Sequence, residues 1–578
     1  MKQSFSILIL PLFFCLLMTK SFSQKKISAS ESTDPKWWKE AIVYQIYPRS
    51  FQDSDGDGVG DLKGIISRLD YIKSLGINVV WLNPIFASPN DDNGYDISDY
   101  RAIMKEFGSM EDFNTLLKGM HKRGIKLVMD LVVNHSSDEH EWFKQSRSSR
   151  TSPYRNYYHW WNAERGQPPY RFSQFDVNHN AWKYDSLTNA YYLHYFSQKQ
   201  PDLNWENPKL RHEIYDIMKF WIAKGIDGFR MDAFQFVAKD TTFPTFPEGY
   251  EKDFINYHAL VHPIHDYLKE MYREVYSKYD IMSVAEGAGR NFADAHDLVD
   301  ADRKELNMAY AFEAIDIPKP EGYSLLKLKR AFSKWDSAFA IKGWLSVFLA
   351  NHDNARMVNR YGNDSREFRE LSSKMLTTFI LTMRGTPYYY NGDELRMNNI
   401  KFSRIEDYRD IATINEYKYQ QSIGGDLNKF IEVAKFSSRD NGRTPFQWNG
   451  SANAGFTTGT PWLSVNPNYK TINAEVQEHD VKSCLNYFRK ATKLRNENKE
   501  LVYGKYEPTD KENEKVYAFI REQNGKKFLV ALNFSKETAL YKTGIDMRHA
   551  KLLLNNYTKV SQPGHLKPYE AVVYAVAK

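Results

Sequence analysis

Strand-like and helix-like patterns alternate along the chain from about residue 37 to about residue 500. Apolar residues spaced three and four apart predict amphipathic helices, for example at 62–75, 110–123 and 208–224. Short apolar runs predict buried strands at residues 41–47, 78–82, 126–133, 228–231, 281–285, 307–312, 347–350 and 387–390. Eight strands that alternate with helices predict an α/β fold, a parallel (β/α)8 TIM barrel.

Two long stretches interrupt this pattern, and the last part of the chain departs from it. Residues 136–205 are too many for a plain loop, so they predict an inserted subdomain after the third strand. A second insertion, roughly residues 392–470, follows the last strand. Short alternating runs from residue 505 predict a C-terminal antiparallel β-sandwich. The predicted barrel therefore comprises residues 24–135 and 206–504, and the sandwich comprises 505–578.

The first 23 residues have the pattern of a secretory signal peptide. Lys2 precedes an apolar stretch of about a dozen residues, and small residues follow at 21–23. That stretch is too short for a membrane span, and a buried helix is the alternative. With Cys15 inside this segment, Cys484 has no partner for a disulfide in the mature chain. An exported chain without disulfides fits a secreted or periplasmic bacterial protein.

The composition narrows the class of molecules that the protein could bind. The 78 basic and 72 acidic residues leave a formal charge of +6, too evenly spread to favour nucleic acid. The aromatic share is high, at 15% of the chain. These rings could be core, or they could line a cleft for sugars, bases or cations. Six of these rings lie in or near the predicted inserted subdomain, namely Trp142, Trp160, Trp161, Tyr191, Tyr192 and Trp205.

Three acidic residues stand at the ends of predicted barrel strands, where barrel enzymes carry their chemistry. They are Asp232, Glu286 and Asp353. Each alone could cap a helix. Arg230 lies two residues before Asp232, on the same side of the strand, and would hold that carboxylate ionised. An ionised carboxylate beside a protonatable one is the arrangement that glycoside hydrolysis requires.

Five motifs now make the chain resemble the α-amylase family, glycoside hydrolase family 13, in its oligo-1,6-glucosidase and α-glucosidase branch. They are Asp-Leu-Val-Val-Asn-His at 130–135, Gln-Pro-Asp-Leu-Asn-Trp at 200–205, Gly-Phe-Arg-Met-Asp at 228–232, Ala-Glu-Gly at 285–287 and Asn-His-Asp at 351–353. The resemblance implies an oligosaccharide substrate and net retention of configuration. It makes Asp232 the nucleophile, Glu286 the general acid and base, and Asp353 the carboxylate that grips the sugar hydroxyls.

The resemblance also assigns the residues around the bound glucose. His135 and His352 would hydrogen-bond its hydroxyls, and Tyr95 would stack on its ring. Asp96 would pair with Arg439 and close the pocket behind one glucose, which implies exo action. Ala233 stands where family members that favour α-1,6 bonds carry valine, so it tilts the expectation towards α-1,4 or mixed linkage.

An acidic loop follows the first predicted strand, with oxygen ligands at every second residue. The loop matches the first half of a calcium loop, but Gly64 at the twelfth position excludes an EF-hand. Magnesium or an empty acidic turn are the alternatives. By resemblance to the branch, the ligands are Asp53, Asp55, Asp57, the Val59 carbonyl and Asp61, and the ion is a structural Ca²⁺.

Two other functions remain open at this point. A relative could pass the glucosyl group to another sugar, as trehalose synthases and sucrose isomerases do. A non-catalytic relative could bind sugar without turning it over. The presence of all three carboxylates favours the enzyme, and the sequence predicts neither a membrane span nor a particular oligomeric state.

Overall fold

The computed structural model describes residues 34–315 and 324–576. Eight parallel strands form one sheet in the order β11-β10-β9-β5-β2-β1-β13-β12. A parallel bridge between Ala309 and Leu345 joins its two ends and closes the barrel. The strands are β1 (Val43–Ile46), β2 (Val79–Leu82), β5 (Lys126–Val132), β9 (Gly228–Asp232), β10 (Met282–Ala285), β11 (Met308–Ala309), β12 (Ser346–Val347) and β13 (Thr386–Tyr390). The predicted TIM barrel is confirmed, although β11 and β12 are shorter than the apolar runs that predicted them.

Helices surround the barrel, and local signals fix their ends. Asn207 caps α5 (Pro208–Lys224), which ends at Gly225 in the left-handed conformation. A capping box formed by Ser109 and Asp112 starts α3 (Met110–Lys122). The other helices around the barrel are α7 (Ile264–Glu274), α8 (Phe292–Val299), α9 (Leu325–Ala338), α10 (Met357–Tyr361), α11 (Arg369–Thr382) and α16 (Cys484–Glu497).

The helix predicted over 62–75 is divided in two. Arg68 leaves the helical conformation between α1 (Leu62–Ser67) and α2 (Leu69–Ser74). Its guanidinium hydrogen-bonds the Gln52 side chain and lies 4.0 Å from the centre of the Trp448 ring. These tertiary contacts account for the break, which the apolar spacing could not reveal.

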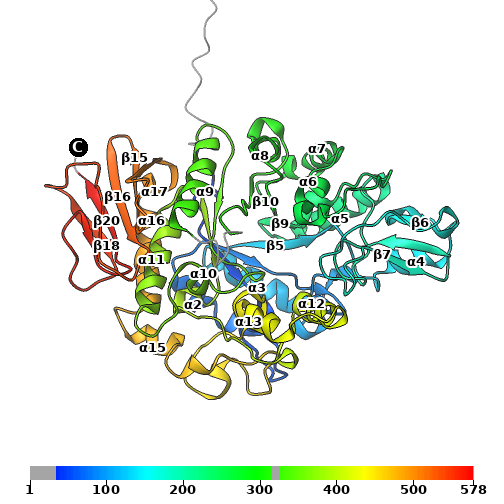
Figure 1. Cartoon of the computed structure of the whole chain (residues 1–578), viewed down its shortest axis with the longest axis horizontal. Helices are drawn as coiled ribbons and strands as arrows, with labels where there is room; N and C mark the ends of the chain where they lie inside the picture. The colour runs from blue at the N-terminus through cyan, green and yellow to red at the C-terminus, as the bar shows by residue number, and fades with distance from the viewer. Residues whose placement is uncertain (1–33, 316–323, 577–578) are drawn as a thin grey trace, which may run out of the picture.

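The two insertions follow the carboxyl ends of β5 and β13, and therefore lie on the side of the barrel where the strands end. The first contains α4 (Glu141–Ser148) and a three-stranded antiparallel sheet of β6 (Trp160–Asn162), β8 (Ala190–Leu193) and β7 (Trp182–Asp185). The second contains α12 (Ile411–Ser422), α13 (Leu427–Ser437) and the short α14 (Asp440–Arg443). Figure 1 shows α12 beside the inserted subdomain.

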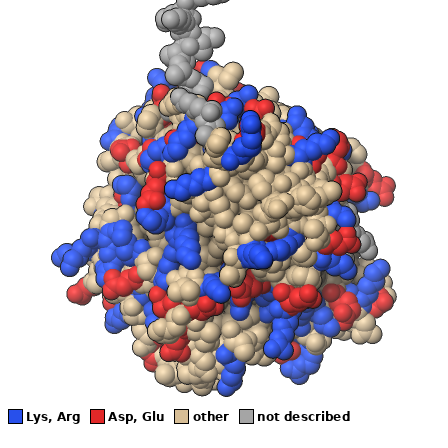
Figure 2. Space-filling model, turned by 90° about the vertical axis from the view of Figure 1, so that its left-hand side faces the viewer, with Lys and Arg blue, Asp and Glu red and all other residues tan. Residues whose placement is uncertain are grey.

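The C-terminal residues form a five-stranded antiparallel sheet with a small two-stranded sheet. The larger sheet has the order β14 (Lys505–Thr509), β15 (Val516–Gln523), β16 (Lys526–Asn533), β20 (Ala571–Val576) and β18 (Lys551–Asn555). The smaller pairs β17 (Ala539–Leu540) with β19 (His565–Leu566). This sheet and the inserted subdomain lie at opposite ends of the molecule (Figure 1). On the face that carries it, charges of both signs are interspersed (Figure 2).

Two buried arginines join the C-terminal sheet to the barrel. Arg521 of β15 donates to the carbonyl oxygens of Thr382 and Leu501, at 2.6 and 2.8 Å. Arg495 of α16 donates to Leu381 and to the same Leu501 oxygen, at 2.9 and 3.0 Å. The two guanidiniums therefore share an acceptor at the junction between the barrel and the sheet.

Among the described residues, none of the helices combines the length and the apolar character that crossing a membrane requires. The predicted signal peptide at 1–23 lies outside the described residues, so export stays a prediction.

Candidate active site

The three predicted carboxylates meet at one cavity of about 800 Å³. Asp232 is the last residue of β9, Glu286 directly follows β10, and Asp353 lies a few residues beyond β12. Parallel strands place their carboxyl ends at one mouth of the barrel, which is why residues distant in sequence converge. The lining includes Asp92, Tyr95, His135, Asp232, Ala233, Glu286, His352, Asp353 and Arg439.

Arg230 organises the base of the cavity. This buried side chain donates to Asp130 at 2.9 Å, and it forms ion pairs with Asp232 and Glu286 through its two terminal nitrogens. Three carboxyl groups thus share one guanidinium, so full ionisation of all three is unfavourable.

The charge balance affects the nucleophile and its neighbour. Burial raises the pKa of Asp232, Arg230 opposes this effect, and the neighbouring Glu286 and Asp130 raise it further. Burial likewise raises the pKa of Asp130 to about 6 against the opposing guanidinium. Arg230 therefore does not offset the burial of Asp232, contrary to the expectation from the sequence that it would hold this carboxylate ionised.

A hydrogen-bond chain fixes the tautomer of His352. The Gln45 amide donates to the Asn83 side-chain oxygen at 2.9 Å and to His352 Nδ1 at 2.8 Å. Because Nδ1 accepts, the ring proton is on Nε2, which lies 2.6 Å from the Tyr95 hydroxyl. That hydroxyl donates to Asp130 at 2.9 Å, and the two rings stack with centres 5.2 Å apart.

Asp353 is held in its charged form by three groups. His352 Nε2 lies 3.0 Å from one carboxylate oxygen, while Arg443 and Arg439 approach the other at 2.9 and 3.2 Å. Burial alone would raise the pKa of Asp353, but these neighbours bring it well below its usual range. An ionised Asp353 can accept hydrogen bonds from sugar hydroxyls.

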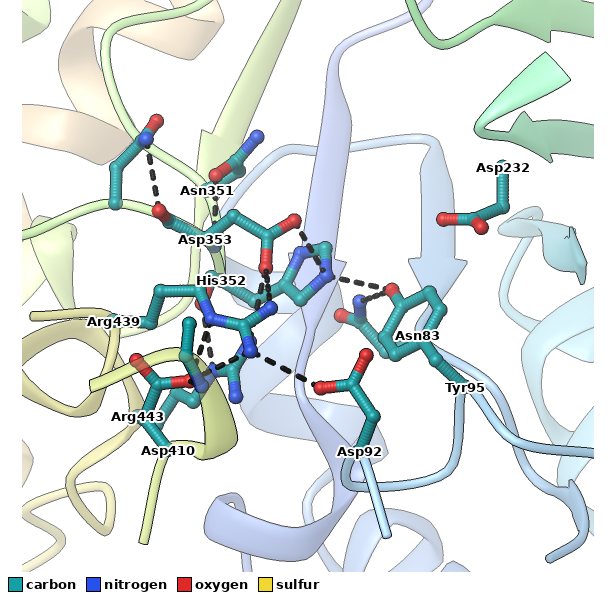
Figure 3. A network of polar contacts seen from close by, with 12 residues as sticks. Asn83, Asp92, Tyr95, Asp232, Asn351, His352, Asp353, Asp410, Arg439 and Arg443 are labelled. Atoms are coloured by element: carbon teal, nitrogen blue, oxygen red, sulfur yellow. Dashed lines mark hydrogen bonds and ion pairs between the residues drawn. The ribbon is translucent and has the colours of Figure 1, made fainter. Parts of the chain in front are cut away.

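Arg439, which lines the cavity, connects three acidic side chains (Figure 3). Besides Asp353, it contacts Asp92 at 3.1 Å and Asp410 at 2.8 Å. Asp92 and Arg439 both line the cavity, from segments far apart in the chain. They form the wall that the sequence assigned to Asp96 and Arg439.

The expected pairing of Asp96 with Arg439 is therefore wrong. The Asp96 side chain is fully buried, and it accepts hydrogen bonds from the Asp91 and Asp92 backbone N–H groups and the Ser88 hydroxyl. Burial raises the pKa of Asp96 to about 7. This residue shapes the loop that presents Asp92, and the sequence pattern could not tell which of these nearby acids reaches the cavity.

Burial keeps the histidines around the cavity neutral. It lowers the pKa of His135 to about 3 and that of His352 well below its usual range. His135 donates from Nε2 to the Tyr95 carbonyl at 3.1 Å and is placed in the cavity wall as predicted. Neutral imidazoles can approach sugar hydroxyls without adding positive charge beside Arg230.

A buried histidine outside the cavity lining makes the free energy of unfolding depend on pH. His258 packs between the Phe254 and Tyr195 rings, and burial lowers its pKa to about 3. Unfolding restores an ordinary pKa near 6.5, so the unfolded chain binds the extra proton and stability falls as pH drops below that value. Between pH 7 and 5 this residue contributes a loss of about 2 kcal/mol. His258→Phe is expected to remove it, as urea unfolding at both pH values would measure.

Replacement of the exposed His212 by Gln serves as the control for that measurement. An unchanged difference between pH 7 and 5 in His258→Phe would contradict the assignment.

The aromatic residues that line the cavity come from the barrel as well as from the inserted subdomain. Tyr95 does line it, while Trp142 and Trp160 pack in the core around β6 and α4. The cavity instead presents Phe175, Phe196, Phe236, Phe292, Phe312 and Trp335. Their positions depend on how the insertions pack, which a single sequence does not display.

A second acidic group lies in the loop after β1. Carboxylate oxygens of Asp53, Asp55 and Asp61 lie within 4.8 Å of one another. Such all-oxygen donors fit a hard divalent cation. Asp57 is outside this group and accepts from the Val59 backbone N–H at 2.7 Å. The structure thus brings together three of the five predicted ligands.

Comparison with known proteins agrees with this geometry. Residues 45–504 match the family model for the catalytic domain of alpha amylase. An oligo-1,6-glucosidase of Parageobacillus thermoglucosidasius is 47% identical over 93% of this chain and 99% of its own. An alpha-glucosidase of Pediococcus pentosaceus is 43% identical, covering 94% and 99%. The solved isomaltulose synthase of Protaminobacter rubrum is 42% identical with a TM-score of 0.90, covering 94% and 100%. The chain belongs to the α-amylase family of glycoside hydrolases.

Proposed function

We propose that the chain is a retaining, exo-acting α-glucosidase of the oligo-1,6-glucosidase type. It would release glucose from the non-reducing end of short α-1,6- and α-1,4-linked glucosides. The observation that carries this function is the placement of Asp232 and Glu286 on one guanidinium, in a cavity lined by the paired Arg439 and Asp92. The curated relatives named for this activity support the proposal.

In the first step, Asp232 attacks the anomeric carbon while Glu286 protonates the leaving oxygen. The C–O bond breaks and a β-glucosyl ester forms on Asp232. Asp353, held charged by Arg439 and Arg443, accepts hydrogen bonds from the sugar hydroxyls. Glu286 then takes a proton from water, which attacks the same carbon. The bond from that carbon to Asp232 breaks, the carboxylate is released, and the α configuration is restored.

The contact of both carboxyls with one side chain supports retention. Retaining enzymes separate the two groups by about 5–5.5 Å, while inverting enzymes need about 6.5–9.5 Å to admit a water. Proton NMR of the first product is expected to show α-glucose before mutarotation. Detection of β-glucose first would refute the retaining assignment.

A panel of short glucosides tests the linkage. We expect release of single glucose units from isomaltose, isomaltotriose, maltose and maltotriose, with little activity on starch because Arg439 and Asp92 close the pocket. The similarity to oligo-1,6-glucosidases favours the α-1,6 substrates, whereas Ala233 in the cavity wall leaves α-1,4 bonds as substrates. Internal cleavage of long chains would contradict the closed pocket.

Transfer to sugar is the second candidate function. The solved trehalulose synthase is 41% identical to this chain with a TM-score of 0.90. Chromatography of products from sucrose decides between the two. Glucose and fructose indicate hydrolysis, while isomaltulose or trehalulose indicates isomerisation.

We also propose Ca²⁺ as the ion of the Asp53, Asp55 and Asp61 group. Asp53 Oδ2 accepts from the Gly58 backbone at 2.9 Å and from the Thr457 hydroxyl, so this loop fastens the second insertion to β1. Its role would be structural, with Mg²⁺ as the alternative occupant.

Chelation is expected to destabilise the protein. Ion binding to the folded state alone stabilises it by about 3 kcal/mol at concentrations a few hundred times Kd. EDTA should therefore lower Tm by several degrees, and Ca²⁺ should restore it, as calorimetry would show. Asp55→Ala is the matched variant, since it removes one exposed ligand and should abolish the response. An EDTA-insensitive Tm would argue for an acidic turn without an ion.

A further inference from the structure

The helix α12 contacts the inserted subdomain through one of its faces. Asn415 donates from Nδ2 to the Phe175 carbonyl oxygen at 2.8 Å. One residue further, Glu416 lies 2.9 Å from His179 Nε2, and the Tyr419 ring lies 4.2 Å from the His179 ring. These contacts hold the loop that contains Phe175 and His179 against α12 (Figure 1).

That loop supplies one wall of the glucose cavity. The Phe175 ring lies 4.6 Å from the Arg439 guanidinium and 5.4 Å from the Phe196 ring. Phe196 in turn lies 5.1 Å from the His135 ring. All four residues line the cavity, so they form a continuous wall from Arg439 to His135.

The start of the same helix holds the other end of this wall. Asp410 caps α12 by accepting from the Ala412 and Thr413 backbone N–H groups. It also accepts from Arg439 Nε at 2.8 Å. One short helix therefore touches Arg439 through its cap and Phe175 through Asn415, about a turn later.

We propose that α12 acts as a strut, by which we mean that it fixes the position of the Phe175 ring relative to the Arg439 guanidinium. Asn415 is then a positioning residue that acts through Phe175. The proposal rests on the proposed glucosidase function, because the wall it sets encloses the glucose unit. The hydrogen bond is to a backbone oxygen, so it fixes the loop and the ring follows. Loosening the wall weakens binding of the glucose unit equally in substrate and transition state, which raises KM and leaves kcat nearly unchanged.

The test replaces Asn415 with Asp, which keeps the shape of the side chain and removes the donor. Asn415→Ala removes the donor without adding charge. Both are expected to raise KM for isomaltose and the inhibition constant of glucose together, about three- to tenfold, as for loss of one hydrogen bond. The kcat should change less than about twofold. Lys418→Ala, at an exposed position of the same helix, is the control and should leave both constants unchanged.

A double-mutant cycle separates positioning from general weakening of the fold. In Phe175→Ala the wall is already lost, so adding Asn415→Ala should raise KM little further. Independent, multiplying effects of the two substitutions would overturn the proposal. So would a lowered Tm with KM and the glucose constant unchanged.

Calorimetric titration with glucose keeps this inference separate from the proposed function. If the wild-type protein binds glucose but does not hydrolyse glucosides, the glucosidase proposal fails while the comparison of Asn415→Ala with wild type still tests the strut. Equal glucose affinity in the two proteins would overturn the strut itself.

Discussion

Replacing Asp232 with Asn is expected to lower kcat on isomaltose and maltose by on the order of 10⁴-fold or more. The amide has nearly the same shape as the carboxylate but cannot attack the anomeric carbon. Since Arg230 keeps its ion pairs with Asp130 and Glu286, the substitution should leave the fold in place. Steady-state rates and circular dichroism measure the two consequences.

Azide can distinguish the two carboxylate roles. In Asp232→Gly, azide is expected to enter the vacated space and give β-glucosyl azide, because one displacement inverts the anomeric carbon. In Glu286→Gly, azide should attack the glucosyl ester and give the α product. The reverse pattern of anomers would exchange the roles assigned to Asp232 and Glu286.

The second large effect is expected at Asp92. Asp92→Asn should lower kcat/KM on short glucosides by about 10²–10³-fold, because a charged acceptor for the terminal glucose and a partner of Arg439 is lost from a closed pocket. Kinetics on isomaltose and maltotriose would measure the loss.

Asp96→Asn is the matched variant four residues further along the same loop. Asp96 does not line the cavity, and it accepts hydrogen bonds from backbone N–H groups. This change should therefore lower Tm, while the kcat/KM of the folded protein falls less than in Asp92→Asn. A greater loss of kcat/KM for Asp96→Asn than for Asp92→Asn would return the pocket role to Asp96.

This pair shows where sequence patterns stop being informative. The convergence of the three predicted carboxylates was predictable because each ends or follows an apolar strand, and the barrel brings the carboxyl ends of its strands together. Asp92 and Asp96 lie in a loop without such periodicity, where the direction of a side chain depends on turns and backbone hydrogen bonds. The positions of Phe175 and Phe196 depend on packing between two insertions, which is a tertiary property.

The barrel helices likewise have some features that local sequence determines and others that depend on distant residues. The bounds of α5 agree with the helix predicted at 208–224, and local residues, the Asn207 cap and Gly225, set its ends. The break at Arg68 depends on Gln52 and Trp448, from segments 16 and 380 residues away in the chain, so no local pattern contains it.

Arg495 and Arg521 share the Leu501 carbonyl oxygen as an acceptor, and this contact bears on whether the barrel and the C-terminal sheet fold independently. The family model stops at residue 504, yet the backbone oxygens of Thr382, Leu501 and Gly504 depend on a guanidinium from β15. Cutting the chain at that boundary would remove this donor from the buried Thr382 and Gly504 oxygens, at a cost of about 1–3 kcal/mol each, whereas Leu501 would keep Arg495 as a donor. The end of the family match at residue 504 therefore does not separate two independently folding units. The barrel and the C-terminal sheet should unfold together, in a single thermal transition.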